Sequence, residues 1–147
     1  MPSPSAADCA APATRDALLA DPEAVIHAAG RYATALNAYS DQLMRWRSDQ
    51  LVSTGRWTRD DALAFGLRIL EDADFSREME TGFRLAHEVV EPMMKVGDDR
   101  RPAAERCEAL IAAQGVFDRI TASVETQWGI IDRLFAAEAQ RLGVALD

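Results

Sequence analysis

The sequence predicts an all-α protein: an up-down-up bundle of three long antiparallel helices, completed by self-association into a larger helical bundle. Two apolar seams and the short turns between the helices support this prediction. The first seam advances by steps of four and three residues through Val25, Ala29, Tyr32, Leu36, Tyr39, Leu43 and Trp46. The second repeats the rhythm through Ala103, Cys107, Leu110, Gln114, Phe117, Thr121, Val124, Trp128, Ile131, Phe135, Glu138 and Leu142. Because this spacing keeps one stripe of a helix turned toward its neighbours, each seam predicts one long helix.

The first predicted helix spans residues 22–53, and local chemistry sets both of its ends. Asp21 can cap free N–H groups, Pro22 suits the first helical position, and Glu23 favours the positive end of the helix dipole. The segment Ser53-Thr54-Gly55 then ends the helix.

The second and third predicted helices span residues 59–96 and 102–142, each followed by a glycine. Thr58 is placed to cap the second helix, with Asp61 near the capping-box position. Pro92 removes a backbone hydrogen bond inside this helix, so its last turn is expected to be kinked or separate.

Residues 1–20 are predicted to form a disordered N-terminal arm, ahead of a single helical-bundle domain over residues 21–147. Prolines and small residues dominate the arm, a composition that cannot bury a core. Cys9 lies in this arm and Cys107 lies on the second seam, so the two cysteines are poorly placed for a disulfide framework. Their placement favours a reducing, cytoplasmic compartment.

Charge and hydropathy restrict the partners that this chain can have. The formal net charge of −8 repels polyanions at long range, which argues against nucleic acid as a partner. No apolar run approaches the length needed to span a membrane, and the N-terminus lacks the basic start and apolar stretch of a signal peptide. Neither a membrane span nor export is therefore expected.

The second and third helices carry more apolar residues than one seam requires, and this excess predicts an interface. The candidate interface residues are Trp57, Leu63, Leu67, Leu70, Met93 and Met94. A second copy around a two-fold axis is the simplest cover for such a surface, and a compact three-helix core with broad stripes is the alternative. For Trp57 the alternative is a hydrophobic staple against Ala62 or Leu63. Trp46 is expected to pack opposite Gly66.

A group of polar residues forms the candidate ligand-binding site. Glu80, His87 and Glu91 share one helix face through steps of seven and four residues. If the helices pair antiparallel about each turn, Tyr32 falls near Glu80 and Thr121 in a polar layer that could bind a small ligand. A solvated flank, or a polar residue that fixes the helix register, would explain the same pattern.

The sequence holds no motif for a nucleophile, a redox dithiol or a phosphate-binding loop, so no enzyme activity is predicted. It also lacks the paired Glu-x-x-His motifs of di-metal bundles, so no metal or cofactor is predicted. The predicted function is protein–protein contact, as a homo-oligomeric adaptor, accessory subunit or chaperone-like factor. A small-ligand or metal-binding bundle, and an amphipathic coat on an apolar granule or membrane surface, are the alternatives.

Overall fold

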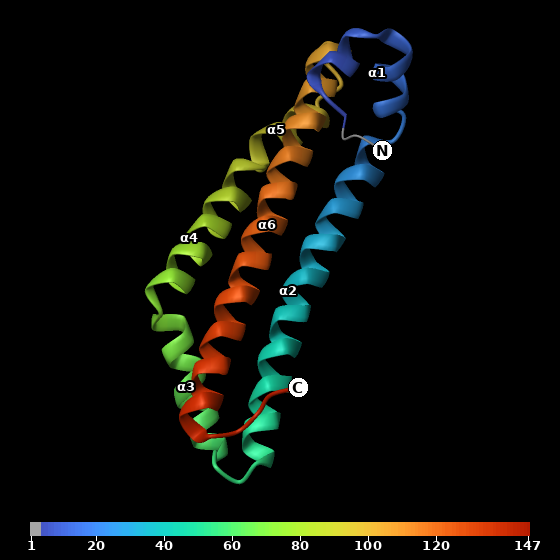
Figure 1. Ribbon diagram of the computed structural model, residues 1–147. Helices are drawn as coiled ribbons and strands as arrows, with labels where there is room; N and C mark the ends of the chain where they lie inside the picture. Colours follow the sequence, from blue (N-terminus) through green and yellow to red (C-terminus); the bar gives the residue numbers. More distant parts are fainter. Residues whose placement is uncertain (1–3) are drawn as a thin grey trace. The chain divides into compact units, whose positions relative to one another are not determined.

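A computed structural model describes residues 4–147 of the protein, with every side chain in that range except that of Val25. Helices make up most of this range (Figure 1). The elements are η1 (Ala6–Ala10), α1 (Pro12–Leu18), α2 (Pro22–Ser53), α3 (Arg59–Glu71), α4 (Ala73–Glu88), α5 (Val90–Val96) and α6 (Ala103–Leu142). Between residues 4 and 147 there is no strand, which confirms the all-α prediction. The first three residues of the predicted arm and the predicted seam position of Val25 lie outside this description.

The chain divides into two compact units. Unit 1 comprises the chain up to Thr34 together with Phe83–Thr121, and unit 2 comprises Ala35–Gly82 together with Ala122–Asp147. Helices α2, α4 and α6 each contribute residues to both units. The region predicted to be a single domain, residues 21–147, therefore contributes to both units.

Several helix ends match the capping chemistry of the sequence. At the start of α2, the Ala24 N–H donates to Asp21 Oδ1 at 3.0 Å. At the start of α3, the Asp61 N–H donates to Thr58 Oγ1 at 3.1 Å and the Thr58 N–H donates to Asp61 Oδ2 at 2.8 Å, which completes the predicted capping box. After α6, Gly143 adopts a left-handed φ of 69°, the conformation that ends many helices.

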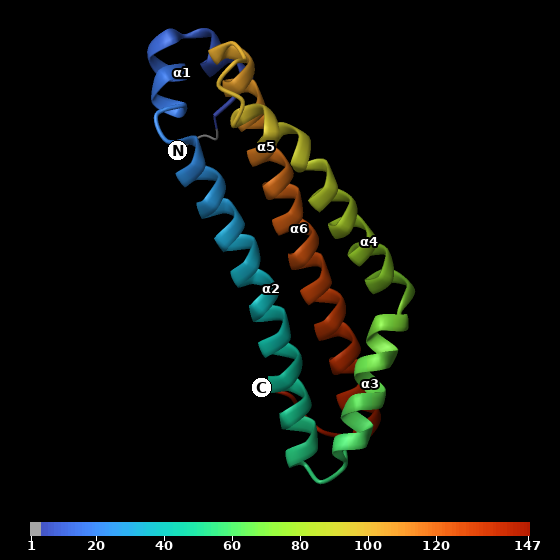
Figure 2. The same ribbon diagram turned by 180° about the vertical axis from the view of Figure 1, so that it is seen from behind.

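The predicted helix over residues 59–96 is interrupted at two points and forms α3, α4 and α5. The first interruption was not predicted: at Asp72 the backbone is extended, with φ −61° and ψ 130°. Asp72 Oδ1 accepts the N–H groups of Asp74 and Phe75, both at 3.0 Å, and so caps the start of α4. Figure 2 shows the bend that results between α3 and α4. The second interruption, at Val89, separates the turn that holds Pro92, as predicted.

Replacing Asp72 with alanine is expected to lower the free energy of unfolding by about 1 kcal/mol, because two N–H groups at the start of α4 lose their acceptor. Urea unfolding followed by circular dichroism measures this change. Glu80→Ala, which removes an exposed carboxylate from the same helix, is the control and should have little effect. Equal losses in the two variants would contradict the capping role of Asp72.

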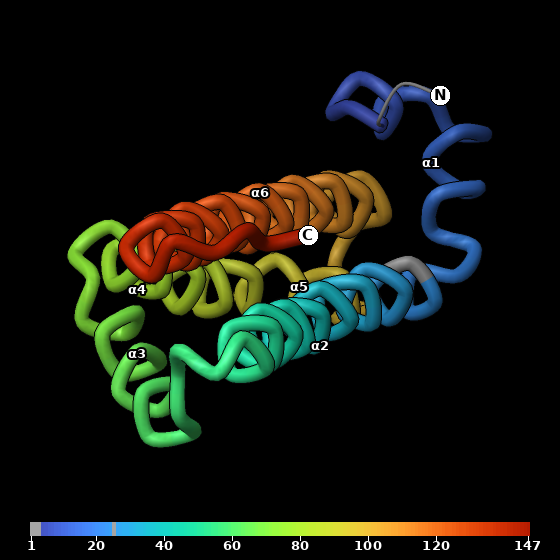
Figure 3. The backbone as a smooth tube through the Cα atoms, turned by 60° about the horizontal axis from the view of Figure 1, so that its bottom comes forward, coloured from blue at the N-terminus to red at the C-terminus, as the bar shows by residue number. Residues whose placement is uncertain are grey.

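The core of unit 2 is a single cluster formed by α2, α3, α4, α6 and the turn after α2. Its buried members are Leu43, Leu51, Trp57, Phe65, Ile69, Phe75, Ile130, Ile131, Phe135 and Ala139. The segment after α6 turns back from the end of that helix (Figure 3) and packs against this core through Val144 and Leu146. Arg47 of α2 donates to the Asp147 carbonyl at 2.5 Å. Burial of one face of α3 leaves its opposite face in solvent.

Only part of the first predicted seam is buried. Leu36 and Leu43 are buried, whereas Tyr32, Tyr39 and Trp46 are about half exposed. The expectation that Trp46 packs opposite Gly66 is wrong. Its ring lies instead under the Arg47 guanidinium, 4.4 Å from the ring centroid, and no atom lies within 4 Å of the point where a Cβ on Gly66 would be.

Unit 1 contains two smaller apolar clusters. One consists of Leu85, Val89, Ala113 and Val116. The other consists of Val96, Ala109 and Leu110, against which Leu18, Leu19 and Ile26 pack. The second cluster therefore holds the end of α1 and the start of α2 against α5 and α6.

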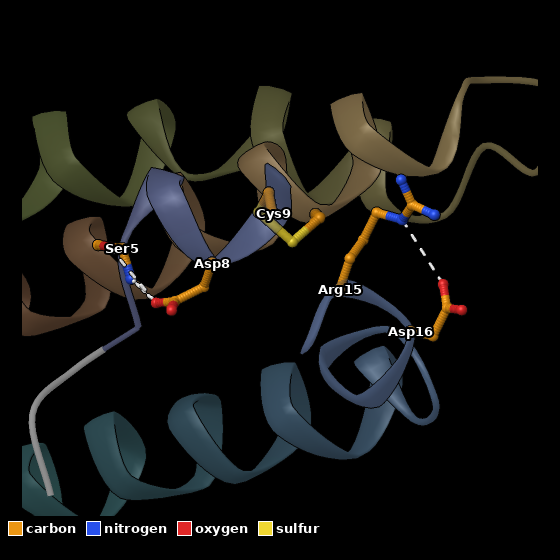
Figure 4. The surroundings of a disulfide bond; sticks show 6 residues. Ser5, Asp8, Cys9, Arg15 and Asp16 are labelled. Atoms are coloured by element: carbon orange, nitrogen blue, oxygen red, sulfur yellow. Dashed lines mark hydrogen bonds and ion pairs between the residues drawn. A yellow bond between two sulfur atoms is a disulfide. The ribbon is translucent and has the colours of Figure 1, made fainter. Parts of the chain in front are cut away.

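A disulfide joins Cys9 of η1 to Cys107 of α6 across 98 residues of sequence (Figure 4). The prediction that these cysteines do not pair is wrong. Where the sequence predicts a disordered arm, the structure has η1 and α1, with Cys9 buried beside α6. Because disulfides persist mainly in oxidising environments, this bond removes the argument for a reducing compartment that was drawn from the cysteines.

Candidate functional site

The most distinctive exposed feature of unit 2 is a row of three leucines on α3, which we call the leucine stripe: Leu63, Leu67 and Leu70. Their side chains are 70%, 62% and 52% exposed. On the opposite face of the same helix, Phe65 and Ile69 are buried in the core. Steps of four and three residues keep the three leucines on one side of the helix, so α3 is apolar on both faces.

Small and charged residues border the leucine stripe. Gly66 lies beside Leu67, and a Cβ added to Gly66 would meet nothing within 4 Å. Asp60 and Glu71 are exposed on α3, as are Arg59 and Arg68. Asp61 is exposed on α3 as well, so this helix carries three acidic and two basic exposed side chains. Arg68 turns toward the core face, where it lies over the Phe65 ring and pairs with Glu138 at 3.8 Å.

Trp57 is buried, so the prediction that it is an exposed interface residue is wrong. Its ring centroid lies 5.1 Å from that of Phe65 and 6.4 Å from that of Phe135. Its Nε1–H donates to Glu138 Oε1 at 3.0 Å. Of the two predicted staple partners, Ala62 packs against the core cluster that contains Trp57, whereas Leu63 faces solvent.

A second set of exposed apolar side chains lies in unit 1, on α4 and α5. Phe83, Val90 and Met94 are each about half exposed or more. The two methionines of the predicted interface therefore differ: Met94 faces solvent, whereas Met93 packs against the cluster around Leu85.

Tyr32 and Thr121, two of the predicted ligand-binding residues, line the same hollow in unit 1. This hollow has a volume of about 500 Å³ and is also lined by Ile111, Phe117 and Asp118. The structure thus brings these two residues to one hollow. The hollow combines an apolar wall with a hydroxyl and a carboxylate.

The other predicted ligand-binding residues do not join them. His87 and Glu91 line a different hollow, of about 760 Å³, where Glu91 pairs with Lys95 at 3.0 Å. Glu80 is exposed on α4, so the expectation that it is a buried acid is wrong.

The buried acid of this protein is Glu138, which was not predicted as a site residue. It is 5% exposed, accepts a hydrogen bond from Trp57, and accepts two from Arg141, at 3.1 and 2.5 Å. The hydrogen bonds from Arg141 lower the pKa of Glu138 below its usual range; burial opposes this effect and the Trp57 bond adds to it. A sequence signal exists, because Glu138 occupies a position of the second apolar seam.

Within residues 4–147, no group of three or more His, Cys, Asp and Glu side chains is placed to hold a metal ion. Nor does any helix in that range have the length and apolar character needed to cross a bilayer. Comparison with protein-family models, curated proteins and solved structures finds no match.

Proposed function

We propose that this protein is a non-enzymatic helical-bundle protein that acts through protein–protein contact, as an adaptor, accessory subunit or chaperone-like factor that forms homo-oligomers. The leucine stripe is the observation that carries the proposal. Three large apolar side chains more than half exposed on one helix face form a surface that water solvates poorly. Such a surface is typical of a binding site for another protein.

The expected association is reversible. Complete burial of one leucine side chain stabilises an association by about 1.5–3 kcal/mol. Six leucines that begin about half exposed, three from each of two copies, would contribute about 5–9 kcal/mol, and association costs at least about 4 kcal/mol. The difference is at most about 5 kcal/mol, which corresponds to a dissociation constant of about 0.2 mM or weaker.

Sedimentation velocity over a range of protein concentrations tests the proposal. The wild-type chain is expected to self-associate, whereas the triple variant L63Q/L67Q/L70Q is expected to remain monomeric. The matched control is F83Q/V90Q/M94Q, which removes three exposed apolar side chains of α4 and α5 and should associate like the wild type. A monomeric wild type, or a leucine variant that sediments like the wild type, would contradict the proposal.

A second candidate function is the binding of a small, partly apolar ligand in the hollow that Tyr32 and Thr121 share. The observation that favours it is the combination of Phe117 and Ile111 with polar groups in one cavity of about 500 Å³, a size that suits small ligands. Native mass spectrometry of freshly purified protein tests it. A retained mass that is lost in Y32A/T121V supports this function, and an unliganded wild-type spectrum contradicts it.

A further inference from the structure

The hollow that Tyr32 and Thr121 share is lined by one face of each of two helices. The α6 face advances by steps of three and four residues through Ile111, Gln114, Asp118 and Thr121. Steps of this size keep side chains on one side of a helix. From α2, Ala29 and Tyr32 line the hollow three positions apart. These residues all belong to unit 1, so the hollow is a feature of that unit alone.

Two aromatic rings contribute to the lining. Tyr32 is 57% exposed, so a ligand can reach most of its ring. Phe117 lines the hollow and also packs against the cluster around Leu85, and this core contact holds its ring in place. The face of an aromatic ring carries partial negative charge and attracts organic cations. The two rings therefore suit a ligand that combines an apolar group with a positive charge.

Asp118 is the one charged group among the described residues that line the hollow. The nearest basic side chains in the sequence do not neutralise this lining. Arg119 pairs instead with Glu88 at 3.2 Å and lines a different hollow. Arg31, next to Tyr32 on α2, is exposed and is not part of the lining. The charge at the wall of this hollow is therefore negative.

We infer that this hollow binds a small organic ammonium ion, that is, a protonated amine that carries a compact apolar or aromatic group. The ammonium group would lie near the Asp118 carboxylate and the Tyr32 ring, with the apolar group against Phe117 and Ile111. The volume of about 500 Å³ suits a small molecule. The net charge of −8 adds a long-range attraction for cations and disfavours anions. This inference rests on the second candidate function and names the ligand class of that site.

Three probes that share a phenyl group and differ in charge test the inference. Phenethylamine is cationic at neutral pH, phenethyl alcohol is neutral and hydrocinnamate is anionic. Titration calorimetry and saturation-transfer NMR at low salt should show the amine binding about fivefold more tightly than the alcohol, and the anion more weakly than either. Added salt should reduce the advantage of the amine, because it screens an exposed carboxylate.

A matched pair of variants locates the site. Asp118→Asn removes the charge and keeps the size of the side chain, so the affinity for phenethylamine should fall about fivefold, to that for the alcohol. The affinity for the alcohol should not change. Glu108→Gln is the control, because it removes an exposed carboxylate from α6 that lines a different hollow. Both positions are exposed, so circular dichroism should show both variants folded.

The outcomes separate this inference from the second candidate function. If the three probes bind equally and Y32A/T121V abolishes their binding, the hollow takes small apolar ligands and the ammonium preference is wrong. If phenethylamine does not bind, or if Glu108→Gln weakens its binding and Asp118→Asn does not, the inference is also wrong. The candidate function itself is then decided by the mass that the purified protein retains.

Discussion

Replacing Cys9 and Cys107 together with serine is expected to lower the free energy of unfolding by about 4 kcal/mol. The disulfide joins residues 98 positions apart, and a cross-link that closes a loop of this length strongly restricts the unfolded chain. This loss is a large fraction of the total stability of an ordinary domain. Few other double substitutions in unit 1 should have so large an effect.

The structural consequence should be concentrated at the N-terminus. The elements η1 and α1 contain five and seven residues, and helices this short do not persist alone in water. Without the cross-link, only contacts such as those of Leu18 and Leu19 with the cluster around Leu110 hold them in place. Residues 4–20 should therefore lose structure before the rest of the chain.

Two measurements check this prediction. Urea unfolding gives the change in stability, and hydrogen exchange followed by mass spectrometry should show faster exchange over residues 4–20 in the double variant. Ala10→Ser, an exposed substitution next to Cys9, is the control and should exchange like the wild type. Protein purified without reductant should contain no free thiol. Two free thiols per native chain, or unchanged exchange in the double variant, would contradict the role assigned to the disulfide.

The parts of the fold that could be predicted are those that nearby residues determine. Asp21 and Thr58 cap helices through hydrogen bonds to groups three residues away, so the sequence contains all the information needed. Asp72 acts through equally local bonds, yet its effect was not foreseen. It lies in a stretch with no glycine or proline, and an aspartate there can equally occupy a solvated position in a continuous helix.

The features that could not be predicted depend on residues far apart in the sequence. Cys9 pairs with a cysteine 98 positions away, and Trp57 binds an acceptor 81 positions away. Helical periodicity states which face a residue occupies, but it does not state which distant element covers that face. For the same reason, the spacing of the three leucines is compatible with core positions as well as with an interface. The burial of Phe65 and Ile69 shows which side of α3 faces inward.

Replacing Glu138 with alanine is expected to lower the free energy of unfolding by about 3 kcal/mol. The substitution leaves the Trp57 Nε1–H without its acceptor inside the core and removes the partner of Arg141. Hydrogen bonds to a buried charged group contribute about 1.5–3 kcal/mol, and a buried donor left without a partner adds to the cost. Trp57→Phe removes the N–H together with the pyrrole part of the indole, so it should also destabilise the core around Phe65 and Phe135.

A double-mutant cycle isolates the bond between these two side chains. Glu138→Gln and Trp57→Phe should together cost less than the sum of their separate effects, because both remove the same charged hydrogen bond. Strict additivity would show that this bond contributes nothing to stability. Phe75→Leu, a buried substitution elsewhere in the same cluster, paired with Glu138→Gln is the control expected to be additive.

The pH dependence of stability provides a second signature of the Glu138 carboxylate. Its pKa in the folded protein lies below the ordinary value of 4.5, mainly because Arg141 donates hydrogen bonds to the ionised form. The unfolded chain therefore takes up the proton first as the pH falls, so the stabilisation is complete at neutral pH and is lost as the pH falls through the folded pKa. Urea unfolding at a series of pH values should show Glu138→Gln less stable than the wild type at pH 7, with the difference shrinking below pH ~4.5. A constant difference across that range would mean that the charge of Glu138 does not stabilise the fold.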